Sequence, residues 1–349
     1  MPPLYVTEQG AKLEVDNRRA TVTKDGETLA SVPLIHVSEV VVMGNVGLTT
    51  PAIKALLGLG VDVVFLTLDG AYCGRLVGPS TPHVLLRRKQ YRCQSEAAFT
   101  LGLAQKFVAA KIQHMRAMLQ RHNRPSASLR TSPSAALRAG ERSDAAIAEA
   151  ILALGTALER APRTTMVSAL TGVEGAATAA YFGAFKRLLD ADWKFEKRQR
   201  RPPPDPVNVL LSFGYTLLAH AAEGAVAAAG LDPYAGFLHG AEYNRPSLAL
   251  DVMEEFRPMV DGVVLWACNS GQIAPGDFAP GEARERPVVM SDGARRRFIE
   301  AYERRMEETF THPKLNQKLS LRQCLLAQAR QVAEAAQSGR AEFVAMGFR

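Results

Sequence analysis

The sequence predicts an α+β protein in which a small β-rich N-terminal domain precedes a larger all-α C-terminal domain. Three observations support this fold class. Short β-branched runs separated by tight-turn pairs fill roughly the first 80 residues, whereas apolar residues recur at helical spacing through the remainder. Between the two patterns the composition changes at the Pro- and Ser-containing segment 79–82. We therefore expect domains at residues 1–82 and 83–349.

Size, charge and cysteine usage narrow the class of protein. A chain of 349 residues is long enough for two hydrophobic cores. Its 42 Lys and Arg residues exceed its 35 Asp and Glu residues, and the surplus lies in Arg-rich runs, which favours a polyanionic partner such as nucleic acid. The N-terminus has no apolar signal core and no uninterrupted apolar run of about 18 residues occurs, so neither export nor a membrane partner is expected. The cysteines form no C-x-x-C pair and indicate reduced thiols in the cytoplasm: Cys73, Cys93, Cys268 and Cys324.

The N-terminal domain reads as a small antiparallel sheet. Strand-like runs are expected at 4–6, 12–15, 19–23, 28–32, 37–43, 61–66 and 72–77. Asp25-Gly26 and Asp69-Gly70 are tight-turn pairs between such runs. One helix is expected at 50–59, with a threonine cap and Pro51 in its first turn. This half of the sequence contains no convincing catalytic cluster.

Helices dominate the C-terminal domain. They are expected at 84–92, 97–120, 144–158, 164–189, 206–218, 292–308 and 315–337, while 123–144 reads as a loop without a motif. Basic residues on the first two helices could contact phosphate, although such residues more often solvate a helix face: Arg87, Arg88, Lys89, Arg92, Lys106, Lys111, Arg116 and Arg121. The same two interpretations apply to Lys314, Lys318 and Arg322 near the last helix.

The segment 186–201 combines basic side chains with two aromatic residues. Its seven Lys and Arg residues could attract phosphate while Trp193 and Phe195 stack on bases or sugars. The alternative is a mobile charged loop.

An acidic helix follows a histidine turn in the stretch 236–258. His239 lies among glycines, and the helix beyond Pro246 places Asp251, Glu254 and Glu255 at i, i+3 and i+4, so that their carboxylates share a face. Clustered carboxylates repel one another unless a cation compensates them, and a nearby imidazole adds a ligand suited to a divalent metal. We interpret the stretch as a metal site, against the alternative of a solvated acidic face.

Glu174 is the exception in a segment of small apolar residues. Gly172 and Gly175 flank it, which indicates a place where helices approach closely and where an unpaired carboxylate would be costly. A metal cation is one partner for such a glutamate. A structural pairing with Arg or with a helix end is the other.

Five sequence stretches resemble one known family. They are TGVEG around Glu174, RPPPDPVNVLLSFGY from Arg201, GLDPYAGFLH ending at His239, RPSLALDVMEEFRP from Arg245, and GNVGLTTPAIKALLGLGVDVVFLTLDGAYCGRL in the N-terminal domain. The first four, in this order, and the N-terminal stretch resemble the CRISPR-associated Cas-one family, the integrase and metal-dependent nuclease of spacer acquisition. The resemblance covers most of the chain, and residues 123–144 are its least typical part.

The resemblance implies a site and a cofactor. Glu174, His239 and Glu254 match the family's ligands for Mg²⁺ or Mn²⁺, and Asp251 matches an acidic position that supports the site or joins it during catalysis. The implied catalytic residues are therefore these four, whereas Glu255 falls at a variable position. Our own expectation for DNA contacts comprises Arg87, Arg88, Arg245, Lys314, Lys318 and Arg322.

The resemblance also implies an activity and partners. The expected reaction is metal-dependent phosphodiester cleavage and strand transfer, which inserts spacer precursor DNA at the repeat of a CRISPR array. The family acts as a homodimer, for which we expect the N-terminal domain to supply contacts, and two dimers assemble with a Cas-two dimer. Two alternatives remain: a non-catalytic DNA-bridging scaffold, and a phosphomonoesterase that uses the same metal. With His239 as a ligand, it is not assigned as the general base.

Overall fold

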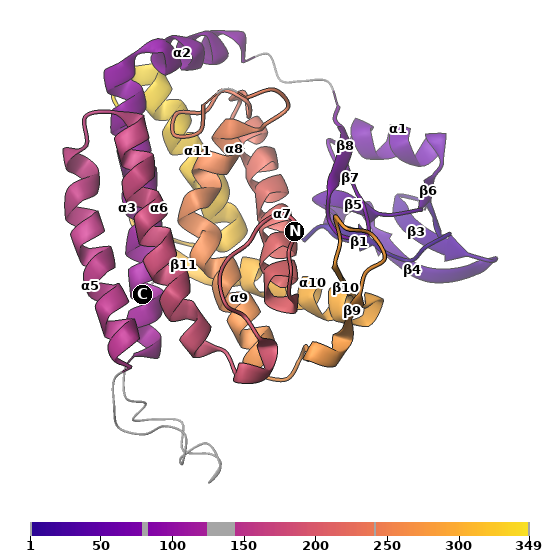
Figure 1. The fold of residues 1–349 in the computed structure, drawn as a ribbon. Coiled ribbons are helices and arrows are strands. Elements are labelled where there is room, and N and C mark those ends of the chain that lie inside the picture. Colours follow the sequence, from indigo (N-terminus) through magenta and orange to yellow (C-terminus); the bar gives the residue numbers. More distant parts are fainter. Residues whose placement is uncertain (1, 79–82, 124–143, 241, 348–349) are drawn as a thin grey trace. The chain divides into compact units, whose positions relative to one another are not determined.

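The computed structural model describes residues 2–78, 83–123, 144–240 and 242–347. The chain divides into two compact units, Met1–Pro82 and His83–Arg349 (Figure 1). The segment 79–82, where the composition changes, lies outside the described residues, and so does most of the predicted loop 123–144.

The described part of the N-terminal unit forms two four-stranded sheets. One has the order β1 (Leu4–Val6), β5 (Glu39–Met43), β7 (Asp62–Leu66) and β8 (Tyr72–Leu76), with only the last strand antiparallel to its neighbour. The other has the order β4 (Glu27–Pro33), β3 (Arg19–Lys24), β2 (Lys12–Asp16) and β6 (Gly47–Leu48), with β2 and β6 parallel. The prediction of one antiparallel sheet is therefore wrong. The crossover through α1 (Thr50–Gly58) brings the chain back into β7 parallel to β5, which a hairpin cannot do.

Local sequence explains the elements of this unit. The Thr49 hydroxyl caps α1 by accepting a hydrogen bond from the Ala52 N–H at 3.2 Å, and Pro51 occupies the first turn. Asp25 and Gly26 both have positive φ, as the tight turn between β3 and β4 requires. The apolar run of β5 is buried at Val40, and it belongs to one core cluster that also holds residues of β2, β3, α1 and β7.

The C-terminal unit is built mainly of helices (Figure 1). α6 (Val167–Phe185) runs without a break through the two glycines that flank Glu174. At Gly172 and Gly175 an added Cβ would meet no described atom within 4 Å, so these glycines do not mark the close helix approach that the sequence suggested. The longer helices are α2 (Val84–Ser95), α3 (Ala97–His122), α5 (Ala145–Arg160), α6 (Val167–Phe185), α7 (Pro206–Ala228), α8 (Ser247–Met253), α9 (Arg257–Asn269), α10 (Asp292–Glu307) and α11 (Leu321–Ser338).

The C-terminal unit is not purely helical. β9 (Phe278–Pro280) pairs with β10 (Val288–Met290), and β11 (Thr309–His312) pairs with β12 (Gln317–Ser320), both antiparallel. The predicted helix start at residue 315 is consequently wrong. Asn316 has a positive φ of 50°, which suits a turn, and α11 begins only after Ser320, whose hydroxyl and backbone form a capping box with Gln323.

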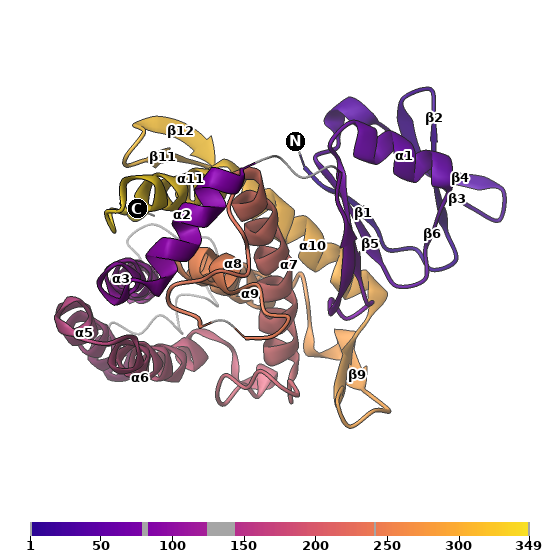
Figure 2. The same ribbon diagram turned by 90° about the horizontal axis from the view of Figure 1, so that it is seen from above.

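Helix α7 lies in the core of this unit. The Asp205 carboxylate caps it by accepting from the Asn208 N–H at 2.8 Å, and Pro206 fits its first turn. An 18-residue window of this helix is apolar enough to be compared with a membrane span, but 56% of the window is buried inside the unit. Figure 2 shows α5 and α6 beside α3, and α7 beside α8 and α9. This arrangement brings α3, α6 and the α8–α9 segment together around one polar cluster.

Candidate active site

Two of the predicted ligands meet on a lysine. Glu174 lies midway along α6, and Glu254 begins the short 3-10 helix η5 (Glu254–Phe256) between α8 and α9. The Lys111 ammonium of α3 donates a hydrogen bond to Glu174 Oε1 and lies 2.6 Å from Glu254 Oε2. Glu174 Oε1 also accepts from the Thr178 hydroxyl at 2.9 Å. Residues that are far apart in sequence thus converge on one cation.

The third predicted ligand lies next to this pair. His239 belongs to the loop between α7 and α8, and its Nε2 is 4.0 Å from Glu254 Oε1. The loop packs tightly on α8, since a Cβ at Gly236 would lie 2.7 Å from the Ser247 Cβ and backbone carbon. Only glycine fits this approach. The Ser247 hydroxyl further fixes the loop by donating to the Gly240 carbonyl at 2.8 Å.

Asp251 orients the histidine. Its fully buried carboxylate accepts from the backbone N–H groups of Phe237 (2.6 Å), Leu238 (2.9 Å) and His239 (2.9 Å), and its Oδ1 lies 2.7 Å from His239 Nδ1. Because a carboxylate can only accept, Nδ1 carries a proton. The Nε2 lone pair of a neutral ring then faces Glu254, as a metal-ligating histidine requires. Of the two roles considered for Asp251, this geometry favours support of the site.

The three carboxylates of the α8–α9 segment do not share one acidic face. Asp251, Glu254 and Glu255 are all buried, and each has different partners. Regular helical spacing fails because η5 tightens the chain between α8 and α9. Asp251 binds the histidine loop, Glu254 faces Lys111 and Arg257, and Glu255 points to Gln328 of α11.

Glu254 is held as an anion. Burial alone would raise the pKa of its carboxyl, but the Arg257 guanidinium and then the Lys111 ammonium outweigh burial and hold this pKa well below its usual range. Arg257 Nε donates to Glu254 Oε1 at 2.7 Å, and its guanidinium lies over the Tyr215 ring at 4.8 Å. Glu254 Oε2 is buried and, within the described ranges, has no hydrogen-bond partner besides its ion pair with Lys111.

The donor set suits a hard divalent cation. It offers carboxylate oxygens from Glu174 and Glu254 and one imidazole nitrogen, and the orphaned Glu254 Oε2 faces the same point as Glu174. As the side chains stand, the described residues contain no group of three or more His, Cys, Asp or Glu positioned to hold a metal. The Lys111 ammonium lies between the two glutamates. The assignment of these residues as metal ligands therefore stays a prediction. Their negative charge and their oxygen and nitrogen donors suit a divalent metal.

Glu255 has a separate environment at the other side of η5. Its oxygens accept from Gln328 Nε2 at 2.6 Å and from the Met346 backbone N–H, while the Met346 carbonyl contacts the His114 ring at 2.7 Å. Phe343 packs edge-on against Phe107 of α3, with ring centroids 5.1 Å apart. Burial raises the pKa of Glu255 to about 7 against the lowering effect of these hydrogen bonds. The segment 343–346 thus packs behind the turn that carries Glu254.

The raised pKa of Glu255 predicts a pH-dependent stability. Between about pH 4.5 and 7 the folded protein retains this proton and the unfolded chain loses it, so the free energy of unfolding falls as pH rises. The expected loss is about 3 kcal/mol across this window. In Glu255→Gln this contribution should disappear, as measured by urea denaturation in EDTA at several pH values. Asp261, whose pKa burial raises to about 6, has the same sign in both proteins. If the free energy of unfolding depended on pH equally in the wild type and in Glu255→Gln, the raised pKa of Glu255 would be contradicted.

Three of the predicted DNA-contacting residues pair with carboxylates other than the predicted ligands. Arg245 pairs with Glu242 at 2.5 Å, Lys314 with Glu334 at 2.5 Å, and Arg322 with Glu303 at 2.5 Å. These pairs are partly exposed and contribute little stability, so a polyanion could compete for the cations. Arg88 and Lys318 are exposed and Arg87 is partly buried. Their contact with DNA stays a prediction.

The predicted stacking role of two aromatic residues is wrong. Trp193 and Phe195 are only 4% and 6% exposed. Trp193 packs against Phe278, and Phe195 packs against Phe182 and Phe185 of α6. Burying the apolar area of these two side chains in the core is more favourable than exposing it to water. The high charge of the surrounding segment hid this preference in the sequence.

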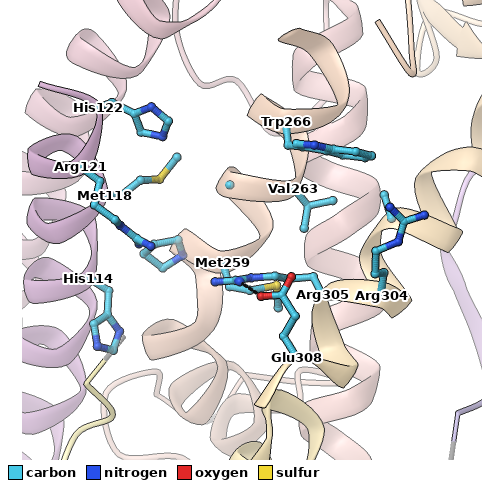
Figure 3. Close-up of a pocket in the computed structure, with 13 residues that line it drawn as sticks. His114, Met118, Arg121, His122, Met259, Val263, Trp266, Arg304, Arg305 and Glu308 are labelled. Carbon is cyan, nitrogen blue, oxygen red and sulfur yellow. Dashed lines mark hydrogen bonds and ion pairs between the residues drawn. The ribbon is translucent and has the colours of Figure 1, made fainter. Parts of the chain in front are cut away.

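A cavity of about 440 Å³ lies further along α3 (Figure 3). Met118, Met259 and Val263 form much of its apolar wall, and Trp266 and three arginines line its other sides. One of these arginines, Arg305, pairs with Glu308. None of the three predicted metal ligands lines the cavity. It is therefore distinct from the Glu174–Glu254 cluster.

Sequence reasoning missed two residues of the site. The sequence placed Lys111 among basic residues expected either to contact phosphate or to solvate a helix face, yet it is 2% exposed. The signal was its position in the apolar stripe of α3, four residues after Phe107 and four before Met115, both buried. Arg257 follows Glu254 at i+3, a spacing at which helical side chains meet.

The chain is similar to proteins of one family. The family model described as CRISPR associated protein Cas1 matches residues 4–304. The CRISPR-associated endonuclease Cas1 3 of Thermus thermophilus is 37% identical over 327 residues, which cover 93% of this chain and 89% of that protein. A CRISPR-associated exonuclease Cas4/endonuclease Cas1 fusion of Geobacter sulfurreducens is 36% identical over 94% of this chain, which spans only 57% of the fusion.

A solved structure shares the fold. A chain of a Cas6-RT-Cas1–Cas2 complex superposes with a TM-score of 0.79 at 26% identity, covering 99% of this chain and 36% of the chain in that complex. The similarity extends over both units described above.

Proposed function

The chain belongs to the CRISPR-associated Cas1 family, and on this premise we propose that it is a metal-dependent DNA endonuclease and integrase that joins spacer DNA to a CRISPR array. One observation supports the proposal above all others. Glu174 and Glu254, from α6 and η5, converge on the Lys111 ammonium, and the His239 Nε2 lies 4.0 Å from Glu254 Oε1. Curated relatives that match most of this chain are named endonucleases.

In this proposal each site residue has a defined task. Glu174, His239 and Glu254 hold Mg²⁺ or Mn²⁺, which supplies Lewis-acid stabilisation of the scissile phosphate. Asp251 keeps the histidine Nδ1 protonated and its Nε2 free, and it fixes the loop through three backbone N–H groups. Arg257 keeps Glu254 ionised and restrains its Oε1. The nucleophile is water in cleavage and a DNA 3′-hydroxyl in strand transfer.

The proposed partners are DNA, a second copy of the chain and a Cas2 protein. The formal net charge of +7 favours a polyanion and its long-range attraction. The similar solved chain comes from an assembly whose name includes Cas2. We propose that homodimers of this chain assemble with Cas2 on spacer precursor and repeat DNA.

Metal removal tests the proposed function. The assay joins a short duplex with free 3′-hydroxyl ends to a supercoiled plasmid that carries a CRISPR repeat, with and without the Cas2 partner. We expect EDTA to lower strand joining by at least about 10³-fold, and Mn²⁺ or Mg²⁺ to restore it, because hydroxyl attack on a phosphodiester needs the bound cation. DNA retention, measured by gel shift in the same buffers, serves as the control and should change little.

The same assay separates the two alternatives. DNA bridging with no cation-sensitive chemistry of any kind would identify a non-catalytic scaffold. Release of inorganic phosphate from small phosphomonoesters, without cleavage or joining of DNA, would identify a phosphomonoesterase.

A further inference from the structure

We propose that the Lys111 ammonium is the resident counter-cation of Glu174 and Glu254, and that a divalent metal must displace it to bind. The inference rests on the proposed metal site and concerns how that site is regulated. Lys111 is 2% exposed on the apolar stripe of α3, where a lysine is costly unless it is paired. Its Nζ donates to Glu174 Oε1 and lies 2.6 Å from Glu254 Oε2. The lysine thus holds the oxygens that the proposal assigns to the metal.

The net charge of the cluster disfavours a state in which Lys111 and a divalent metal are both present. Glu174, Glu254 and Asp251 supply three negative charges, and Lys111 and Arg257 supply two positive ones. The cluster therefore has one negative charge left. A divalent cation added to it would leave one positive charge, whereas the same cation with the lysine displaced leaves the cluster neutral. In a buried site a net charge of either sign is expensive, which favours the neutral state in which the metal has replaced the lysine.

Lys111 is the cation that can leave. Arg257 is restrained at both sides, by the 2.7 Å hydrogen bond from its Nε to Glu254 Oε1 and by the Tyr215 ring 4.8 Å from its guanidinium. A lysine ammonium is a point charge on a flexible four-carbon stem. Its contact with Glu254 Oε2 is an ion pair at 2.6 Å, and no other described group contacts that oxygen through a hydrogen bond, so departure of the ammonium would release it for a new ligand. The lysine therefore stabilises the metal-free site and weakens metal binding.

The test removes the charge of Lys111 and keeps a side chain of similar size. Lys111→Met removes the ammonium and retains an unbranched side chain, and Lys106→Met makes the same change at an exposed position on the same helix. Mn²⁺ binding is measured by electron paramagnetic resonance of the free ion, and stability by thermal unfolding. We expect Lys111→Met to bind Mn²⁺ at least about tenfold more tightly than the wild type. Its melting temperature should fall by several degrees in EDTA and rise more steeply with Mn²⁺.

Further variants keep the outcomes distinct. Lys111→Arg retains the charge and should bind Mn²⁺ no more tightly than the wild type, even if Lys111→Met folds poorly. Glu254→Gln defines which binding belongs to the site. Mn²⁺ binding that Glu254→Gln weakens, but that Lys111→Met leaves equal or weaker, would overturn the displacement and leave the metal site standing. Mn²⁺ binding that is unaffected by Glu254→Gln would instead overturn the metal site itself, and the displacement with it.

Discussion

Glu254→Gln is expected to lower metal-dependent strand joining by at least about 10³-fold, because it removes the charge on which three parts of the site depend. Glu254 Oε2 pairs with Lys111, its Oε1 accepts from Arg257, and the same Oε1 faces the His239 ring. The amide retains the shape of the carboxylate but binds a divalent cation poorly. The rate of joining is measured at saturating DNA with Mn²⁺ and with Mg²⁺.

The matched control is Glu255→Gln, the same change at the next buried residue of η5. Glu255 binds Gln328 and the Met346 N–H and is not among the predicted ligands, so this variant should keep most of the joining activity near neutral pH. DNA affinity should be similar in all three proteins. If Glu254→Gln joined DNA as fast as the wild type, the assignment of this site would be wrong.

Asp251→Asn is expected to lower joining by about 10²-fold and to reduce stability by roughly 2–3 kcal/mol. The carboxylate accepts three backbone N–H groups and faces the protonated Nδ1 of His239. An amide at this position offers one acceptor oxygen and places its own N–H group against donors. The histidine then loses the hydrogen bond that sets its tautomer, and Nε2 is no longer held toward Glu254.

A second buried aspartate separates the catalytic effect from the loss of stability. Asp261 accepts hydrogen bonds from Tyr181 and Tyr215 in the same unit and contacts none of the predicted ligands. Asp261→Asn should destabilise the protein by a similar amount, with a much smaller loss of joining when both variants are assayed well below their melting temperatures. Equal losses of activity would mean that Asp251 acts only through stability.

The regular elements were predictable because each depends on local spacing. Apolar periodicity located α3, α7 and α10, and Asp205 marked the start of α7 correctly. The register of the N-terminal sheets was not predictable, since the pairing of β2 with β6 joins residues about 35 positions apart and no local pattern encodes it. The hairpin of β11 and β12 was not predicted, and the residues of β12 fall within the range 315–337 that the apolar pattern assigned to one helix.

The site was predictable as a set of residue types but not as a set of contacts. The resemblance to a family implies Glu174, His239 and Glu254 as ligands; Glu174 and Glu254 meet on Lys111, and the His239 Nε2 lies 4.0 Å from Glu254 Oε1. Sequence spacing alone gave an acidic face that does not exist, because η5 turns Glu254 and Glu255 to different partners. The burial of Lys111 could be inferred from its position in the apolar stripe of α3, but its partners could not, since they lie 63 and 143 positions away in the chain. A long-range ion pair leaves no periodic trace.

The segment 343–346 has a consequence for how the protein can be altered. It restrains η5 through two contacts. Phe343 packs against Phe107 of α3, and the Met346 N–H donates a hydrogen bond to Glu255, the neighbour of Glu254 in the chain. An insertion or deletion that displaces residues 343–346 would remove these contacts, and η5 would then be less restrained. Residues 343–346 are therefore mechanically coupled to Glu254, and an insertion that displaces them is expected to lower joining although it leaves the proposed ligands unchanged.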